Sequence, residues 1–434
     1  MAQTKQNFRP YLGLTFLIGF GFFTMGLMDP LYDTYVPIFL SRYISSMGIV
    51  GSVMTLDNIF AIFLIPIVAV WSDKVRTPIG RRMPFIIVTL PLTAICFGLL
   101  PYAAAASLIT LIVVIFLLNV WKQSARGPVV ALMPDIVPGE FRSEANGVIN
   151  TMGGIASIVG TLGLARLMDL DIVLPILGPT KGRIPFPLAG LLVVFAVVLL
   201  VSFVHERGST EKSAEEKVAL KESLKAIAGS KDKSALLILI SLFLWFLGYQ
   251  GVLPFIGKFS VEILGVSQGL AAFAAGMVGI AYALFAIPSG YVAHRIGRRR
   301  TIRIALAVIV VLMLTLFFLD PLTSAFGLSG MAKVYFFWAV LFLFGIVWVT
   351  VVTNSFPMLW QMATYGNMGI YTGLYYTFGQ AAAILSPPLT GALIDLAGYR
   401  GIFMFCAVCM AGAFVVMGFV KSGEPERNPE KAAQ

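Results

Sequence analysis

Long apolar segments follow one another along this chain, separated by short stretches that carry most of its charged residues. Each segment holds about 20 residues with few or no charges, which is the length that one helix needs to cross a bilayer. The segments cover residues 12–35, 49–71, 85–106, 108–132, 146–165, 186–204, 236–256, 270–293, 302–319, 334–358, 370–394 and 401–420. The pattern predicts an all-α membrane protein with twelve transmembrane helices.

A hydrophilic stretch rich in Lys and Glu divides the twelve predicted helices into two groups of six. We therefore expect an N-terminal six-helix bundle over residues 1–205, a charged cytoplasmic linker over 206–235, a C-terminal six-helix bundle over 236–420 and a cytoplasmic tail over 421–434. Two near-equal groups of six are typical of a duplicated unit, so the two bundles are expected to be pseudo-symmetric.

Three short matches between the two halves support this duplication. They pair residues 32–37 with 249–254, the loop segments 69–73 and 80–82 with 290–294 and 297–299, and residues 147–153 with 373–379. The matched segments keep their order, and the two copies lie a nearly constant 217 to 226 residues apart. Each match is short, but their common order and spacing indicate an internal repeat.

The composition excludes most soluble enzymes. Hydrophobic residues make up 58% of the 434 residues and charged residues only 12%, which is too apolar for a water-soluble globule. With two His and three Cys, the chain is poorly supplied for a His-ligated metal centre or a disulfide framework. It also lacks a phosphate-binding Gly-x-x-x-x-Gly-Lys loop, which argues against transport driven by ATP. We therefore expect no cofactor.

The basic residues are distributed unevenly between the two sides of the predicted membrane. The net charge is +10, and 22 of the 31 Lys and Arg residues lie at the termini and in the loops on the same side, while two fall inside an apolar segment. The remaining seven lie on the opposite side: Arg42, Arg166, Lys181, Arg183, Lys258, Lys333 and Arg400. The positive-inside rule then places both termini in the cytoplasm. The charge orients a multi-pass protein in the cell membrane and does not indicate nucleic acid as a partner.

The loop after the second predicted helix carries residues 72–74 (SDK) followed by 80–82 (GRR), and a degenerate copy lies at 290–299. Together with the six-plus-six layout, this loop resembles that of the major facilitator superfamily, and the resemblance covers essentially the whole chain. It implies the twelve-helix major facilitator fold and a transporter that works by alternating access. In such a transporter, two halves rock around a site near the middle of the membrane.

Two segments resemble a narrower group within that superfamily. Residues 66–86 look like the sucrose/proton symporters and the related glycoside-pentoside-hexuronide cation symporters, and residues 126–135 are similar to the fourth helix of the sucrose group. One position departs from that group, because its arginine in the fourth helix falls at Val130 here, while Arg126 lies a turn earlier. The resemblance therefore does not carry over the identity of the substrate.

The same resemblance implies a gate at the cytoplasmic ends of the second and third helices. In that family the carboxylate and the cations of this loop latch the two halves in one state, and here they correspond to Asp73, Gly80, Arg81 and Arg82. Such a latch must open once in each transport cycle. Asp135, near the inner end of the fourth helix, is a further candidate for the gate, and an exposed cap is its alternative role.

Five ionisable residues fall inside predicted helices, where an ionised side chain is costly and marks a functional candidate. Asp29 and Asp57 lie at similar depths, and Asp33 lies one turn from Asp29 on the same face. Lys122 and Arg126 share one face of the fourth helix, where they can oppose these carboxylates or bind solute. Converging carboxylates suit coupling to a proton or Na⁺, because the bound cation relieves their repulsion. A static charge network is the alternative.

The second half offers hydrogen-bonding and aromatic groups in place of charges. Amides bond the hydroxyl groups of sugars, and aromatic faces cover their C–H surfaces, although packing explains any single aromatic residue equally well. The candidates for binding solute in this half are Trp245, Tyr249, Gln250, Asn354, Tyr371, Tyr375, Tyr376 and Gln380.

These observations predict a cation-coupled, proton-preferring secondary transporter for a sugar, a glycoside or a similar small polar solute. We expect it to act as a monomer in the lipid bilayer. An exporter of amphipathic compounds on the same fold is the first alternative, and it would need a more apolar cavity than Lys122, Arg126 and Asn354 suggest. A transporter-like sensor or a membrane enzyme is the second, but the sequence shows no nucleophile and base at a recognisable spacing.

Overall fold

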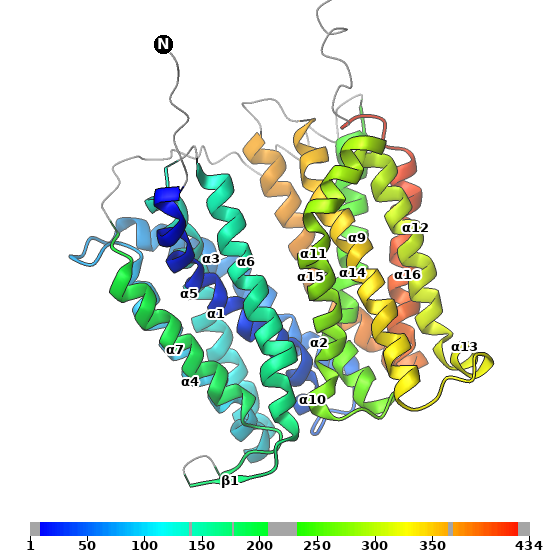
Figure 1. The fold of residues 1–434 in the computed structure, drawn as a ribbon, viewed down its shortest axis with the longest axis horizontal. Coiled ribbons are helices and arrows are strands. Elements are labelled where there is room, and N and C mark those ends of the chain that lie inside the picture. Colours follow the sequence, from blue (N-terminus) through cyan, green and yellow to red (C-terminus); the bar gives the residue numbers. More distant parts are fainter. Residues whose placement is uncertain (1–8, 139–140, 176–177, 207–231, 363–367, 424–434) are drawn as a thin grey trace, which may run out of the picture. The chain divides into compact units, whose positions relative to one another are not determined.

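The protein folds almost entirely into α-helices, as Figure 1 shows. The computed structural model describes residues 9–138, 141–175, 178–206, 232–362 and 368–423. Within these residues the only strands are β1 (Val173–Leu174) and β2 (Gly178–Pro179), which form a short antiparallel hairpin. Helices satisfy their own backbone hydrogen bonds, which a chain in lipid requires.

The helices belong to two compact units. The first unit comprises residues 1–212 together with 254–279, and the second comprises 213–253 together with 280–434. The division falls inside two helices, so the residues from 254 to 279 pack with the first unit although they follow the linker in the sequence.

The first unit contains the helices of the N-terminal half. These are α1 (Arg9–Leu40), α2 (Met47–Met54), α3 (Leu56–Lys74), α4 (Met83–Ala106), α5 (Leu108–Ile136), α6 (Arg142–Ile158) and α7 (Pro185–Phe203). A π-helical turn, η2 (Val159–Gly163), and a 3-10 helix, η3 (Leu164–Asp169), extend α6. The second predicted helix is interrupted at Thr55, which separates α2 from α3 and places Asp57 in the first turn of α3.

The remaining helices follow the linker. They are α9 (Ser234–Glu262), α10 (Gln268–Ala271), α11 (Phe273–Ile296), α12 (Arg298–Phe317), α13 (Leu319–Ala325), α14 (Met331–Trp360), α15 (Met368–Ala397) and α16 (Gly401–Gly418). The end of α9, the whole of α10 and the start of α11 lie in the first unit, and the other helices of this group lie in the second.

Eleven helical segments of the described chain are long and apolar enough to cross a membrane. They overlap eleven of the twelve predicted spans, which are confirmed as helices of suitable length and composition. The twelfth, 370–394, lies within α15, whose 30 residues are also sufficient for a crossing. This helix carries Tyr371, Tyr375, Tyr376 and Gln380 among its apolar residues, which lowers its hydropathy.

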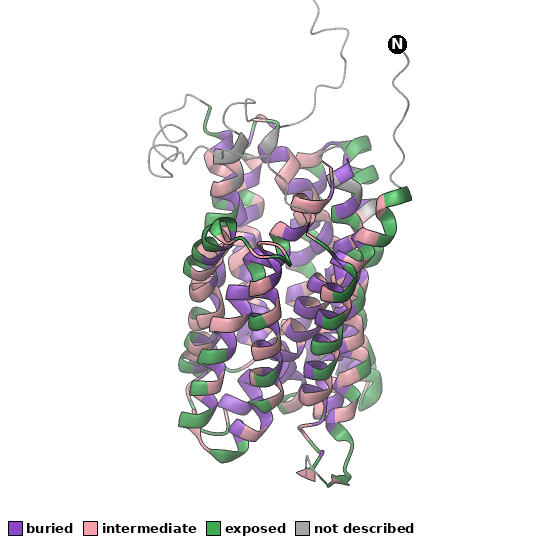
Figure 2. Cartoon of the chain, turned by 90° about the vertical axis from the view of Figure 1, so that its left-hand side faces the viewer, coloured by how far each residue is buried: buried purple, intermediate pink, exposed green. Residues whose placement is uncertain are grey.

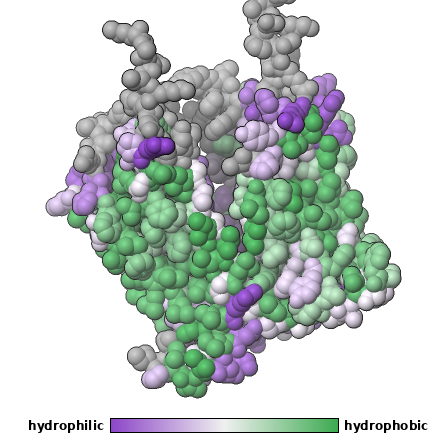
Figure 3. Space-filling view, in the orientation of Figure 1, coloured by the Kyte–Doolittle hydropathy of each residue, from purple (hydrophilic) through white to green (hydrophobic). Residues whose placement is uncertain are grey.

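The surface of the helices is apolar as well as their packed faces. Figure 2 shows buried and exposed residues alternating around the helices, and large apolar side chains such as Phe63, Leu191 and Val311 are exposed. In Figure 3, hydrophobic residues cover most of the visible helical surface, and hydrophilic residues gather near the helix ends. Apolar side chains on both the inner and the outer faces are expected for helices surrounded by lipid.

Glycines bring α1 and α6 into close contact in the first unit. A Cβ atom added at Gly26 would lie 2.8 and 2.9 Å from the backbone C and Cα atoms of Gly153, and one added at Gly160 would lie 2.9 Å from the carbonyl oxygen of Leu27. The backbone of α1 therefore packs closely against α6 and against η2, which extends α6. Small residues let two helix backbones approach, which gives membrane helices their packing energy.

We expect Gly26→Ala to destabilise the protein markedly, because the new methyl group meets backbone atoms that cannot rotate away. Overpacking of this kind typically costs about 1–3 kcal/mol. The matched control is Gly13→Ala on the same helix, where the added Cβ meets nothing within 4 Å. Thermal unfolding in detergent should show a lower Tm for Gly26→Ala only. An unchanged Tm in both variants would contradict the close packing.

Candidate functional site

A buried lysine joins three helices of the first unit. Lys122 of α5 places its Nζ atom 3.0 Å from Asp29 Oδ1 of α1 and 3.0 Å from Asp57 Oδ1 of α3. Its side chain is only 5% exposed, whereas both carboxylates are partly exposed. Asp57 lies in the first turn of α3, where the positive end of the helix dipole favours a carboxylate. We call Lys122, Asp29, Asp57 and the neighbouring Asp33 the Lys122 cluster.

Three polar residues that the sequence analysis did not select complete the surroundings of Lys122. Gln123 donates a hydrogen bond from Nε2 to Asp57, and Asn119 donates one from Nδ2 to the hydroxyl of Tyr32 at 3.1 Å. The ring of Tyr32 lies 5.0 Å from Lys122 Nζ, which is a cation–π contact. The signal for the two amides was present in the sequence, since both are polar residues inside a predicted apolar span.

The charges of the Lys122 cluster do not balance. Asp33 lies one turn from Asp29 on α1, is half-buried and forms no ion pair within the described chain. Arg126, the second predicted cation, is exposed on α5 and pairs with none of the three carboxylates. Three carboxylates and one ammonium therefore leave a formal charge of −2 when all four groups are ionised. Such an excess attracts a cation or a proton.

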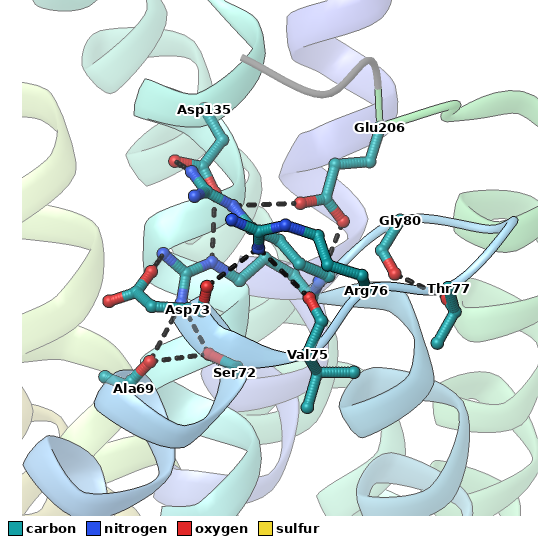
Figure 4. Close-up of polar contacts among 11 residues, drawn as sticks. Ala69, Ser72, Asp73, Val75, Arg76, Thr77, Gly80, Asp135 and Glu206 are labelled. Carbon is teal, nitrogen blue, oxygen red and sulfur yellow. Dashed lines mark hydrogen bonds and ion pairs between the residues drawn. The ribbon is translucent and has the colours of Figure 1, made fainter. Parts of the chain in front are cut away.

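A second ionic group lies around the loop between α3 and α4, and Figure 4 shows its contacts. Arg82 is 6% exposed, donates from Nε to Asp135 Oδ2 at 2.9 Å, and pairs through Nη2 with Asp73. It also donates from Nη1 to the carbonyl oxygen of Ala69 at 3.0 Å and to the hydroxyl of Ser72. One guanidinium therefore links the end of α3 to α5.

The predicted gate residues Arg81 and Asp135 belong to the same group. Arg81 donates from Nη2 and Nε to the two oxygens of Asp135, at 2.6 and 3.2 Å. Burial opposes the charge on Arg81, but the hydrogen bond and the negative charge of Asp135 outweigh it and raise the pKa of the guanidinium above its ordinary value. Asp135 is therefore held by two arginines rather than standing as an exposed cap.

Glu206, which the sequence analysis placed at the start of the linker, is a further member. Its Oε1 lies 3.4 Å from Arg81 Nε, and its Oε2 accepts a hydrogen bond from the backbone N–H of Arg82 at 2.8 Å. Gly80 has φ = 111°, and a Cβ there would lie 2.6 Å from Glu206 Cβ. Only glycine suits this position. We call Asp73, Arg81, Arg82, Asp135 and Glu206 the loop ion network.

Aromatic rings of α9, α14 and α15 gather in the second unit. Tyr249 stacks on Trp348 with ring centroids 4.1 Å apart and planes 10° apart, and Phe246 meets both Trp348 and Tyr375 edge to face. The hydroxyl of Tyr375 lies 3.2 Å from that of Ser355. Two of the predicted residues, Tyr249 and Tyr375, are therefore brought together, whereas Trp348 and Phe246 were not predicted. We call these four rings the aromatic cluster.

The other predicted residues of the second unit are placed differently. Trp245 is fully buried, and its indole nitrogen has no hydrogen-bond partner among the residues that the structure describes. Asn354 is buried and donates to the carbonyl oxygen of Thr350 in its own helix at 2.9 Å. Tyr376 is exposed but contacts Tyr375 edge to face. Half-buried positions are occupied by Gln250, Tyr371 and Gln380.

The segment from 254 to 279 is held on the first unit by hydrogen bonds. Asp169 at the end of η3 accepts from the hydroxyl of Ser267 at 2.5 Å and from the backbone N–H of Gly269 at 3.1 Å. Tyr35 of α1 donates to the carbonyl oxygen of Gln268 at 2.8 Å. These hydrogen bonds attach the start of α10 to α1 and to the end of η3.

Comparison with known proteins identifies the family. Residues 14–386 match the family model of the Major Facilitator Superfamily, which covers most of the chain. The chain belongs to the major facilitator superfamily. The predicted resemblance to the superfamily and the twelve-helix fold class are thereby confirmed, whereas the narrower resemblance to the sucrose and glycoside symporters stays a prediction. A search of curated proteins found no match.

Several solved transporter structures share the fold at low identity. A mutant of the nucleoside transporter NupG has a TM-score of 0.72 at 14% identity, with 94% of this chain and 100% of that chain covered. A bacterial homologue of the human lysosomal transporter Spinster, inward-facing and occupied, gives 0.70 at 12%, covering 96% and 97%. An inward-facing bacterial homologue of the iron transporter ferroportin gives 0.69 at 15%, covering 96% and 100%. The family indicates a membrane transporter, and these neighbours share its fold.

Proposed function

We propose that this superfamily member is a proton-coupled symporter of a small polar solute, most simply a sugar or a glycoside. The observation that carries the proposal is the Lys122 cluster, in which a single buried lysine pairs with Asp29 and Asp57 while a third carboxylate, Asp33, lies one turn from Asp29. A buried site with excess negative charge binds a proton or Na⁺ because the cation relieves the repulsion between the carboxylates. We place coupling at Asp29, Asp57 and Asp33.

In this proposal, protonation changes the pairing of Lys122. When Asp57 or Asp29 takes up a proton, Lys122 loses one of its two ionic partners, and the contact between α5 and the neighbouring helix weakens. Because Lys122 bridges α1, α3 and α5, the arrangement of these helices then depends on whether the cation is bound. This dependence is what couples the cation gradient to alternating access.

The solute is proposed to bind through polar and aromatic groups of the second unit. Within the aromatic cluster, Tyr249 and Phe246 are half-buried, and aromatic rings of this kind cover the C–H surface of a sugar. Amides for its hydroxyl groups are supplied by Gln250, Gln380 and Asn354. In the first unit, Lys122 and Arg126 stay predicted donors of hydrogen bonds to a solute. The resemblance of residues 66–86 and 126–135 to sugar and glycoside symporters points to the same class of solute.

We further propose that the protein lies in the cell membrane with both termini in the cytoplasm and acts as a monomer. The excess of Lys and Arg at the termini and in alternate loops supports this orientation. The loop ion network is then cytoplasmic, where its ion pairs hold the ends of α3, α4, α5 and α7 in one arrangement.

The decisive experiment is uptake into proteoliposomes of a labelled panel of mono- and disaccharides. The panel is measured with an imposed proton gradient, with a Na⁺ gradient and with neither. Accumulation of one sugar under the proton gradient alone is the expected result, and accumulation under Na⁺ alone would change the coupling ion. If no sugar moves under any condition, the sugar proposal is wrong, and amphipathic compounds and export are tested next on the same vesicles.

We propose that the segment from 254 to 279 leaves α1 and η3 and returns in each transport cycle. We expect Gly269→Ala to slow transport about tenfold, because overpacking by about 1–3 kcal/mol disfavours the packed state. An added Cβ would lie 2.8 Å from Asp169 Cγ and 3.1 Å from the carbonyl oxygen of Arg166. In the control, Gly279→Ala, the nearest atom is 3.8 Å away. Equal rates of solute exchange in both variants would show that this contact does not limit the cycle.

A further inference from the structure

Two arginines at one end of the first unit have no acidic partner within the described chain. Arg42 follows the end of α1, and Arg183 precedes the start of α7. Each guanidinium lies on an aromatic ring: the Cζ atom of Arg42 is 5.1 Å from the centroid of Phe39, and that of Arg183 is 5.5 Å from the centroid of Tyr102. These contacts hold both side chains in defined positions.

The ring of Phe186 connects the end of α1, which precedes Arg42, with the start of α7, which follows Arg183. The ring of Phe186 in α7 lies 5.4 Å from Phe39 of α1 and 5.1 Å from Phe97 of α4. Arg42 and Arg183 each lie three residues from one of the touching rings, Phe39 and Phe186. Partial burial lowers the pKa of Arg42, and the positive charge of Arg183 acts in the same direction. The two guanidiniums are therefore near enough to repel each other.

Two carboxylates of the first unit on the same predicted side as this pair are engaged by other cations. Asp171 pairs with Lys181 at 3.2 Å, and Glu262 lies 3.5 Å from Lys258. Two positive charges held together without a counter-ion favour an anion, and two guanidinium forks match the oxygens of a phosphate group. The chain places few cations on this side of the predicted membrane, so their meeting here is not a consequence of a generally basic face.

An apolar strip leads away from the arginine pair along α4. Leu99 and Ile95 lie three and seven residues before Tyr102, which puts all three on one face of the helix. Leu99 is 48% and Ile95 57% exposed, and exposed apolar residues within a membrane span contact acyl chains. Tyr43, which is also exposed, follows Arg42 at the end of α1, where an aromatic ring suits the headgroup level.

We propose that Arg42 and Arg183 bind the phosphate of a membrane phospholipid, whose acyl chain runs along Leu99 and Ile95. The cationic pair recognises the phosphate, and the apolar strip distinguishes a lipid from a soluble anion of the same chemistry. A bound lipid at this point joins the ends of α1, α4 and α7 and replaces the repulsion between the two arginines by a shared attraction.

Native mass spectrometry of the purified full-length protein tests this site with phosphatidylglycerol as the probe. The wild type is compared with the double variant Arg42→Gln/Arg183→Gln. The control, Arg166→Gln/Lys333→Gln, removes the same number of charges from the same predicted side and, like the test variant, an arginine on an aromatic ring. Asp320, the partner of Lys333, keeps its ion pair with Arg400. Loss of the two charge-assisted contacts should weaken retention of the first lipid about tenfold in the test variant, with the control retaining it as the wild type does.

A second variant controls for the case in which the first variant misfolds. Arg42→Lys/Arg183→Lys keeps both charges but loses the guanidinium forks, and we expect a smaller loss of about threefold with an unchanged Tm. Equal lipid retention by the wild type and both test variants would overturn the proposal, as would an equal loss in the control. A parallel titration uses inorganic phosphate alone. If phosphate binds as tightly as the lipid, the site takes a soluble anion and the lipid assignment is wrong.

Discussion

Asp57→Asn is expected to abolish accumulation of the solute against its gradient while leaving exchange of the solute intact. The asparagine has nearly the same shape but carries no charge, so the Lys122 cluster loses a carboxylate that we propose to bind the proton. Lys122 keeps its ion pair with Asp29 at 3.0 Å, and the buried lysine is therefore not left without a partner. The variant should fold and still bind the solute.

The size of the effect follows from the driving force. A membrane potential of 100 mV is worth about 2.3 kcal/mol for each charge moved, which supports about 50-fold accumulation when one cation accompanies one solute. In proteoliposomes under this potential, Asp57→Asn should reach only the equal concentrations that facilitated diffusion gives. Counterflow exchange, which needs no coupling ion gradient, should continue.

The matched control is Asp171→Asn, which makes the same chemical change at an exposed carboxylate. Asp171 pairs with Lys181 at 3.2 Å, and both side chains are more than half exposed, so the pair contributes little. We expect this variant to accumulate solute as the wild type does. If Asp57→Asn accumulates solute as the wild type does, Asp57 is not part of the coupling site. The Lys122 cluster would then be a static charge network.

Arg82→Gln is expected to have the second large effect, on both stability and transport. Arg82 is nearly buried and holds Asp73, Asp135, Ser72 and the carbonyl oxygen of Ala69. Removing one partner of a buried ion pair typically costs about 3–5 kcal/mol, because the remaining charges lose their compensation. Asp73 is half exposed and Arg81 still pairs with Asp135, so the cost should lie at the lower end.

Two measurements separate the stability effect from the transport effect. Thermal unfolding in detergent should show a lowered Tm, and the transport rate should fall about tenfold or more while the solute affinity changes little, because the loop ion network lies far along α3 from Asp57. The control is Arg76→Gln in the same loop. Arg76 is exposed and, among the residues that the structure describes, donates only to the backbone carbonyl oxygens of Asp73 and Val75. Equal Tm values and equal transport rates in Arg82→Gln and Arg76→Gln would contradict the proposed role of Arg82 in the loop ion network.

The composition of the candidate site was partly predictable from the sequence. Ionisable residues inside apolar segments are visible in one dimension, so Asp29, Asp57 and Lys122 could be selected without coordinates. The pairing of these residues could not be predicted, because a small rotation of α5 decides whether Lys122 or Arg126 faces α1 and α3. The structure turns Lys122 toward the carboxylates and leaves Arg126 exposed.

Residues whose partners are distant in the sequence were missed for the same reason. Glu206 lies in a charged stretch, and the sequence around it does not predict that its side chain lies next to Gly80 and the backbone N–H of Arg82. Trp348 is one aromatic residue among many in an apolar helix until Tyr249 stacks on it. Contacts of this kind depend on the depth and rotation of whole helices, and these are set by packing over many residues.

The sequence by itself determined the number and type of the spans, the repeat and the superfamily, because hydropathy over about 20 residues decides whether a segment enters lipid. It also marked the intramembrane charges. Only the tertiary structure decided which charges pair, that Thr55 separates α2 from α3, and that the residues from 254 to 279 pack with the first unit. Burial in a membrane is a property of each segment alone, whereas an ion pair is a property of two segments and of the geometry between them.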